Sequence, residues 1–196
     1  MDTLAVAVTL FLIMDPLGNI PIFLSVLKQV EAKRRSRIIV REMLIALAVM
    51  LLFLFSGPTI LRTLSLSREA VAIGGALVLM IIAIRMIFPL RGAAVMGDDD
   101  IDGEPFIVPL AIPLVAGPSL LATLILLVEN DPGHSMRWFT ALMMAWSVTL
   151  VILLSSQILF KLLGNRGLKA IERLMGMILI SVAVQMMLDA IKSIIT

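Results

Sequence analysis

The stretch MDPLGNIP, residues 14–21, places an acid, an amide and two prolines inside an otherwise apolar segment. Proline in a helix interior removes a hydrogen bond and clashes with the preceding turn, so Pro16 and Pro21 predict a broken helix. We expect Pro21 to begin the second half-helix, with Asn19 close by as a cap. The free N–H groups of such a start suit a carboxylate, and the carbonyls that end the first half-helix suit a cation. Together they would suit an amino acid zwitterion.

Asp15 lies near the centre of this segment, where an ionisable side chain is a candidate functional group. Two interpretations remain open. The carboxylate could simply cap a half-helix that starts at Pro16, or it could contact a proton, an ion or a substrate ammonium. We favour the second interpretation, because a neutral cap would serve equally well in hydrocarbon.

A related pattern recurs in the second half of the chain. Residues 16–21 read PLGNIP and residues 113–118 read PLVAGP. We expect a second broken helix there, with Pro118 beginning its second half and Gly117 as the cap. Helices interrupted at matching places in two halves indicate a transporter binding site. The predicted substrate-binding residues are therefore Asp15, Pro16, Gly18, Asn19, Pro21, Pro113, Ala116, Gly117, Pro118 and Ser119.

Three ionisable residues are candidates for ion coupling: Asp15, Arg85 and Asp189. Arg85 lies near the end of its apolar segment, and we expect its side chain to extend to the membrane surface. Asp189 lies close to the C-terminus and is expected at the membrane interface. The adjacent Arg41 and Glu42 are expected to mark a membrane edge.

The elements that must position these residues follow from composition. The chain of 196 residues is 60% hydrophobic and has a mean hydropathy of +1.09. Apolar stretches of about 20 residues recur, the length that crosses a bilayer core of about 30 Å. The sequence therefore predicts a single integral membrane domain over residues 1–196. The first segment lacks the basic start of a signal peptide, so we expect it to remain in the mature protein.

Several classes of function are disfavoured by the same composition. The net charge is +2 and no basic patch is interleaved with aromatic residues, so we expect no nucleic-acid partner. Cysteine is absent, which excludes disulfides and thiolate chemistry. The single histidine, His134, has no second ligand near it in the sequence, and we expect neither a metal site nor a cofactor. No His–Ser or paired-acid arrangement indicates catalysis, so we expect no enzyme.

Six apolar segments are predicted to be transmembrane helices, because a strand edge cannot be satisfied in lipid: 3–27, 39–61, 70–89, 106–128, 138–160 and 171–191. Residues 1–90 hold the first three and residues 106–196 the others. The Gly- and Asp-rich stretch 91–105 is interpreted as an acidic linker. Three crossings is an odd number, so the second half enters from the opposite face. We therefore expect an all-α membrane fold of six transmembrane helices in two inverted three-helix repeats, with helices 1 and 4 broken.

Basic residues indicate the orientation of this arrangement. They are concentrated in the predicted connectors 28–41 and 165–173, which lie on the same side of a six-helix protein. The positive-inside rule places these connectors and the acidic linker in the cytoplasm, and both termini outside. The first connector carries six Lys or Arg residues, whereas the matching connector of the second half carries only Arg137. Equivalent connectors therefore lie on opposite sides, as an inverted repeat requires.

Three stretches resemble the MarC family of small prokaryotic membrane proteins, and within it the YhgN-like branch: MDPLGNIPIFLSVLK, EPFIVPLAIPLVAGPSLLATLILL and ERLMGMILISVAVQMMLDAI. The resemblance covers nearly the whole chain. It implies six membrane helices in a prokaryotic inner membrane and points at the same two proline-containing segments. Some members of the family are described as transporters of small neutral amino acids such as glycine and alanine.

These observations favour a secondary transporter of small neutral amino acids that works by alternating access and is coupled to protons or sodium ions. The chain lacks a nucleotide-binding P-loop, so ATP coupling would need a separate subunit. Two alternatives remain open: an exporter of other small metabolites or drugs, and a non-transporting membrane protein. The aromatic content of 5% argues weakly against a broad apolar substrate. The cost of irregular backbone in lipid argues against a scaffold.

Overall fold

The computed structural model describes residues 2–27, 30–88 and 115–195, and these ranges consist of helices joined by short turns. The elements are α1 (Thr3–Met14), α2 (Pro16–Val26), α3 (Ala32–Thr63), α4 (Arg68–Ile87), α5 (Pro118–Asn130), the 3₁₀ helix η3 (Pro132–His134), α6 (Ser135–Leu154) and α7 (Ser156–Ile195). The predicted all-α class is confirmed over this part of the chain. The predicted linker 91–105, Pro113 and the first part of segment 106–128 lie outside the described residues.

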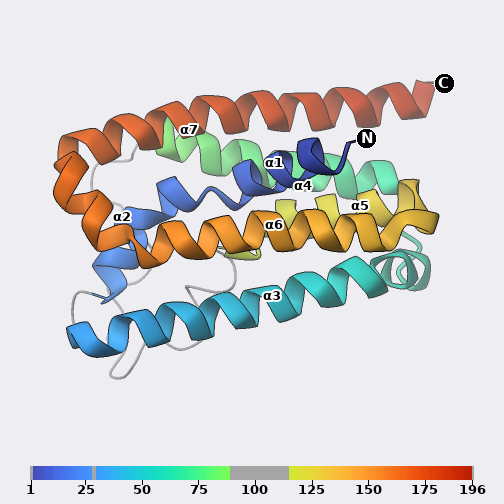
Figure 1. The fold of residues 1–196 in the computed structure, drawn as a ribbon. Helices are drawn as coiled ribbons and strands as arrows, with labels where there is room; N and C mark the ends of the chain where they lie inside the picture. The colour runs from blue at the N-terminus through green and yellow to red at the C-terminus, as the bar shows by residue number, and fades with distance from the viewer. Residues whose placement is uncertain (1, 28–29, 89–114, 196) are drawn as a thin grey trace.

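The long helices form an antiparallel bundle, and both ends of the chain lie at the same end of it (Figure 1). The most extensive packing joins α4 to α7, which run in opposite directions. α1 packs against α6, α3 against α5 and α6, α4 against α5, and α2 against α7. α6 therefore contacts both the first membrane segment and α3, which brings the two into a common core.

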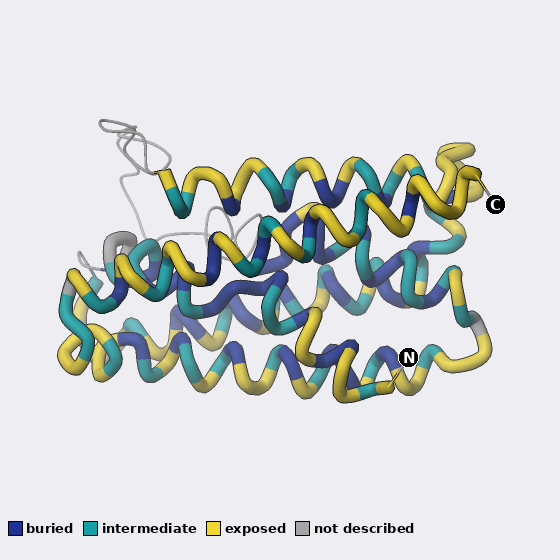
Figure 2. The backbone as a smooth tube through the Cα atoms, turned by 90° about the horizontal axis from the view of Figure 1, so that it is seen from above, coloured by how far each residue is buried: buried dark blue, intermediate teal, exposed yellow. Residues whose placement is uncertain are grey.

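Five segments of the described chain are long and apolar enough to cross a membrane, and α5, with 13 residues, is shorter. Buried residues lie on the facing sides of the helices, while the outward faces are exposed (Figure 2). Those outward faces are also apolar, with exposed large side chains that include Phe55, Ile81, Val151 and Met177. A helix that is apolar on every side is suited to a lipid environment. The bundle is therefore that of an integral membrane protein.

The basic connectors are more helical than the sequence predicted. α3 begins at Ala32, so most of 28–41 is helical, and the stretch 165–173 lies within α7. The predicted fifth segment, 138–160, is also wrong at its end, because α6 stops at Leu154. Lysine and arginine are good helix formers, so a helix continues past the point where its apolar residues end. Within α7, the direction changes at Gly164, whose φ of 61° is not helical.

Small residues let α4 approach its neighbours closely. A Cβ added at Gly176 of α7 would lie 3.0 Å from the carbonyl oxygen of Ala83 in α4. A Cβ at Gly75 of α4 would lie 2.8 Å from the Cβ of Ala122 in α5. Helices in membranes associate through such close packing, because lipid supplies no hydrophobic driving force between them. α4 is thereby fixed between α5 and α7.

Candidate functional site

The first membrane segment is interrupted at Asp15, which ends α1 and begins α2. Asp15 adopts a left-handed conformation with φ 43° and ψ 59°, and its N–H donates to the carbonyls of Phe11 and Leu12. Its Oδ1 accepts a hydrogen bond from the N–H of Gly18 at 3.2 Å. This bond is the capping interaction that the sequence suggested for a helix starting at Pro16. The carboxylate is only 7% exposed, so the acid is buried inside the bundle.

The break is shorter than the sequence predicted. Pro16, not Pro21, is the first residue of the second half-helix, and Pro21 lies within α2. The expectation for Pro21 was wrong because the Asp15 cap already supplies a helix start, where the missing N–H of Pro16 costs nothing. Inside α2, Pro21 instead leaves the carbonyl of Leu17 without its usual helical donor.

Asn19 also has a different role from the predicted one. It lies within α2, and its side-chain Nδ2 donates to the carbonyl of Met14 at 3.0 Å. The amide therefore satisfies a carbonyl at the end of α1 instead of capping the start of α2. Asn19 is 8% exposed, and together with Asp15 it forms a polar junction inside an apolar segment.

Gly18 fits this junction because it has no side chain. A Cβ at this position would overlap the carboxylate of Asp15 and the terminal methyl of Met86 in α4. The last turn of α4 therefore packs against the break. Its neighbour Arg85 is exposed, so the structure does not bring that predicted coupling residue to the carboxylate.

The second predicted half-helix begins where the sequence placed it. α5 starts at Pro118, and Gly117 is the residue before it, with extended backbone at φ −69° and ψ 160°. No side chain caps this start within the described chain. Ala116 and Ser119 are both buried. The carbonyl of Ser119 accepts a hydrogen bond from Thr123 Oγ1 at 2.8 Å.

A cavity of about 610 Å³ lies toward the end of the bundle that carries the termini, and neither Asp15 nor Ser119 is among the residues that line it. Its walls include Ile13 in the last turn of α1 and Thr123 in the second turn of α5. The predicted coupling residue Asp189 also lines it, and its carboxylate accepts a hydrogen bond from Gln185 Nε2 at 2.8 Å. The volume is typical of a small-molecule pocket.

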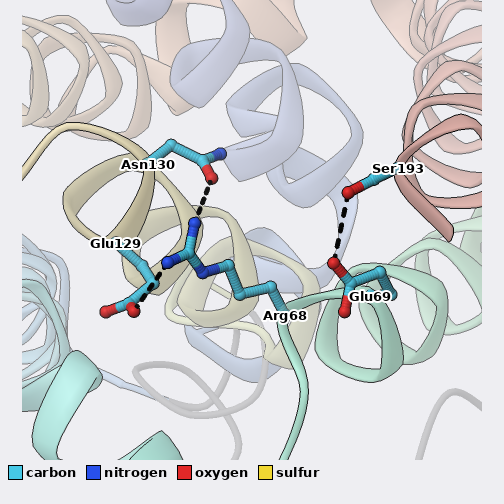
Figure 3. A network of polar contacts seen from close by, with 5 residues as sticks. All are labelled: Arg68, Glu69, Glu129, Asn130 and Ser193. Carbon is cyan, nitrogen blue, oxygen red and sulfur yellow. Dashed lines mark hydrogen bonds and ion pairs between the residues drawn. The ribbon is translucent and has the colours of Figure 1, made fainter. Parts of the chain in front are cut away.

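Charged side chains surround the mouth of this cavity (Figure 3). Arg68, at the start of α4, donates to Glu129 at 3.1 Å and to Asn130 at 3.4 Å, which ties α4 to the end of α5. The next residue, Glu69, accepts a hydrogen bond from Ser193 of α7 at 3.2 Å. Both signs of charge therefore line the entrance. Among the described residues, no three His, Cys, Asp or Glu side chains are grouped as metal ligands.

The sequence interpretation missed the environment of Glu42. This residue was expected at a membrane edge, yet it is 1% exposed and lies on the buried face of α3. The signal was present in the spacing, because Ile39, Met43 and Ala46 share a helical stripe with Glu42. All three of those apolar residues are buried.

Comparisons with known proteins agree with the membrane character of the bundle. The model of the family described as "MarC family integral membrane protein" matches residues 2–195. The chain is 55% identical over 191 residues to the UPF0056 inner membrane protein YhgN of Escherichia coli (strain K12), covering 97% of this chain and 96% of that protein.

Other organisms carry similar proteins. A UPF0056 membrane protein of Buchnera aphidicola subsp. Baizongia pistaciae is 52% identical over 193 residues, covering 98% of this chain and 97% of the relative. The UPF0056 membrane protein MJ1677 of Methanocaldococcus jannaschii is 30% identical over 191 residues, with 94% and 93% covered. No solved structure matches the chain.

Proposed function

This chain belongs to the MarC family of integral membrane proteins, and we propose that it is a secondary transporter of small neutral amino acids such as glycine and alanine. The observation that carries the proposal is the break at Asp15, a buried acid in the middle of an apolar span. Irregular backbone and an ionisable group are both costly in lipid. Transporters place such features at their binding sites.

The two helix starts supply complementary chemistry for a zwitterion. α5 begins without a side-chain cap, so the N–H groups of Ser119 and Leu120 are available to a substrate carboxylate. The Asp15 carboxylate uses Oδ1 for its capping bond and has a second oxygen that can accept from a substrate ammonium. In this proposal, Ile13 and Thr123 mark the path from the cavity toward these groups.

The packing supports the proposed inverted repeat. If the first membrane segment, α3 and α4 correspond to α5, α6 and α7, exchanging the two sets should preserve the most extensively packed pairs. Contacts of α1 with α6 and of α5 with α3 form one exchanged pair, and those of α2 with α7 and of α5 with α4 form another. The pairs α3–α6 and α4–α7 map onto themselves and run antiparallel. Alternating access would then involve movement of one set against the other.

The proposed orientation places the charged cavity outside the cell. Both termini share its end of the bundle, and the starts of α3 and α7, whose first turns are followed by basic residues, lie at the other end (Figure 1). The positive-inside rule puts the latter in the cytoplasm. A reporter enzyme that works only outside the cytoplasm should therefore be active when it is fused to the C-terminus. An inactive fusion would contradict the orientation.

Uptake into proteoliposomes tests the transport proposal. Purified protein should accumulate labelled glycine or alanine when a proton or sodium gradient is imposed, and empty liposomes should not. Excess unlabelled substrate should compete. If neither amino acid enters under any gradient, and neither exchanges across the membrane, the amino acid proposal is wrong.

A further inference from the structure

Glu42 is a buried acid that takes no part in the helix break at Asp15. It lies within the apolar span Arg34–Thr63 and is 1% exposed. Its Oε1 accepts hydrogen bonds from Nε and Nη2 of Arg41 at 3.0 and 2.8 Å. Its Oε2 is buried and has no hydrogen-bond partner among the residues that the structure describes. An unsatisfied oxygen on a buried charge is costly, so a purely structural ion pair is a poor explanation.

The position of Glu42 relates it to the candidate site through α6. Trp146 of α6 donates its indole N–H to the carbonyl of Met43, next to Glu42, at 2.9 Å. Thr149 of the same helix donates to the sulfur of Met14, next to Asp15, at 3.4 Å. Three residues along a helix correspond to about 4.5 Å. The α6 residues that contact the neighbours of Glu42 and of Asp15 therefore lie within one helical turn of each other.

A second cavity approaches Glu42 from the end of the bundle opposite the termini. It has a volume of about 190 Å³, and its walls include Ile39, which lies one turn before Glu42 on the same face of α3. Arg35, Ser36, Ser156 and Gln157 give this cavity polar walls. A polar space of this size can hold several water molecules. Glu42 itself does not line this cavity; the lining residue nearest to it along α3 is Ile39.

The surroundings of Glu42 favour a proton over a metal ion as its ligand. The neighbouring residues on its buried face are apolar, whereas a hard cation needs several oxygen ligands. Among the described helices that pack extensively against α3, which are α5 and α6, the charged side chains are Glu129 and Arg137, both beside the turn that joins α5 to α6. That turn lies at the end of the bundle that carries the termini (Figure 1). On α3 itself, Arg41 faces the carboxylate and Arg35 lines the second cavity.

We propose that Glu42 binds and releases the proton that couples transport, with the second cavity as its route to the cytoplasm. The proposal rests on the proposed transport function. In the structure, the carboxylate is paired with the Arg41 guanidinium. Both residues are on α3, so the pair separates when the Arg41 side chain turns away; the buried carboxylate then takes up a proton from water in the cavity, because an unpaired charge is unfavourable there. Return of the Arg41 side chain releases the proton again.

Infrared titration of the purified, reconstituted protein tests this role without any substrate. The wild type should show a buried carboxylic-acid carbonyl band that changes with pH. Glu42→Gln should lose part of that band, and what remains would belong to the other buried acid, Asp15. Glu31→Gln should keep the whole band, since Glu31 is exposed at the start of the same helix and its side chain makes no capping bond. An identical titration in wild type and Glu42→Gln would overturn the proposal.

A second variant covers the case in which Glu42→Gln does not fold. Glu42→Asp retains a carboxyl one methylene shorter, so the titrating band should remain but shift. An unshifted band would assign it to another acid and overturn the proposal. In transport assays, Glu42→Gln should lose gradient-driven glycine accumulation while exchange without a gradient persists. If the wild type moves neither glycine nor alanine, only the amino acid proposal fails, and the infrared result still decides the role of Glu42.

Discussion

The two helix starts in the candidate site, at Pro16 and at Pro118, come from similar sequence patterns but differ in their chemistry. The first is capped by an acid, whose Oδ1 bonds the N–H of Gly18. The second follows Gly117 and has no side-chain cap. The repeated pattern thus gives two helix starts, of which one is capped by a carboxyl side chain and the other has no side-chain cap within the described chain. In the proposed transporter, this difference would let two similar helix starts bind the two charged ends of an unsymmetrical substrate.

The largest effect is expected where the first start is most tightly packed. Gly18→Ala places a methyl group against the Asp15 carboxylate and Met86. Overpacking of this kind costs roughly 1–3 kcal/mol, and it would also displace the carboxylate. We expect a lower thermal unfolding temperature and loss of glycine accumulation.

Gly74→Ala is the matched control for that change. A Cβ at Gly74 of α4 meets nothing within 4 Å. Alanine is the better helix former, by about 0.5–1 kcal/mol, so this variant should be as stable as the wild type or more stable. Equal unfolding temperatures for the two alanine variants would show that the packing at the first helix start does not matter.

Asp15→Asn addresses the charge at the first start without removing the cap. Asparagine caps helices about as well as aspartate, within a few tenths of a kcal/mol, so folding should be preserved. The variant cannot ionise, and we expect it to lose gradient-driven accumulation. If the role is coupling alone, exchange without a gradient survives; if the acid contacts the substrate, exchange fails as well.

The control for this variant is Asp2→Asn. Asp2 precedes α1, is exposed, and makes no side-chain capping bond. It should transport like the wild type. Wild-type accumulation by well-folded Asp15→Asn would leave Asp15 as a cap only, and the contrast between the two helix starts would then have no functional meaning.

The sequence predicted the helical class, the interruption near Asp15 and the start of α5 at Pro118, because proline has strong local effects on the backbone. It misplaced the first restart by choosing Pro21. A local pattern cannot show which of two prolines will coincide with a tertiary contact, and here Met86 packs where Gly18 leaves room. Glu42 was assigned to a membrane edge because its neighbour is Arg41. Glu42 is buried because it lies on the same apolar face of α3 as Met43. The sequence does not show that this face packs against α6.

The smallest effect is expected at the far end of α5, where Arg68 helps to place the uncapped helix. Arg68→Gln removes the ion pair with Glu129, whose two side chains are 49% and 15% exposed. Ion pairs this exposed contribute roughly 0.2–1 kcal/mol to stability, so the unfolding temperature should fall only slightly. At high salt the pair is screened in the wild type, so the difference in unfolding temperature should be smaller still. Glycine uptake should weaken through a higher KM, because the cavity loses one of the two guanidinium groups, of Arg62 and Arg68, that line it and α5 is held less firmly.

Arg166→Gln is the control for this last change, since Arg166 is exposed near the start of α7, at the opposite end of the bundle. It removes the same charge from the protein without touching the charged cavity, and it should leave KM unchanged. A rise in KM for Arg68→Gln alone would connect the position of α5 to substrate binding. Equal KM values in both variants would mean that the packing of α5 on α3 and α4 is enough to position the N–H groups of Ser119 and Leu120. The ion pair of Arg68 would then only line the edge of the cavity.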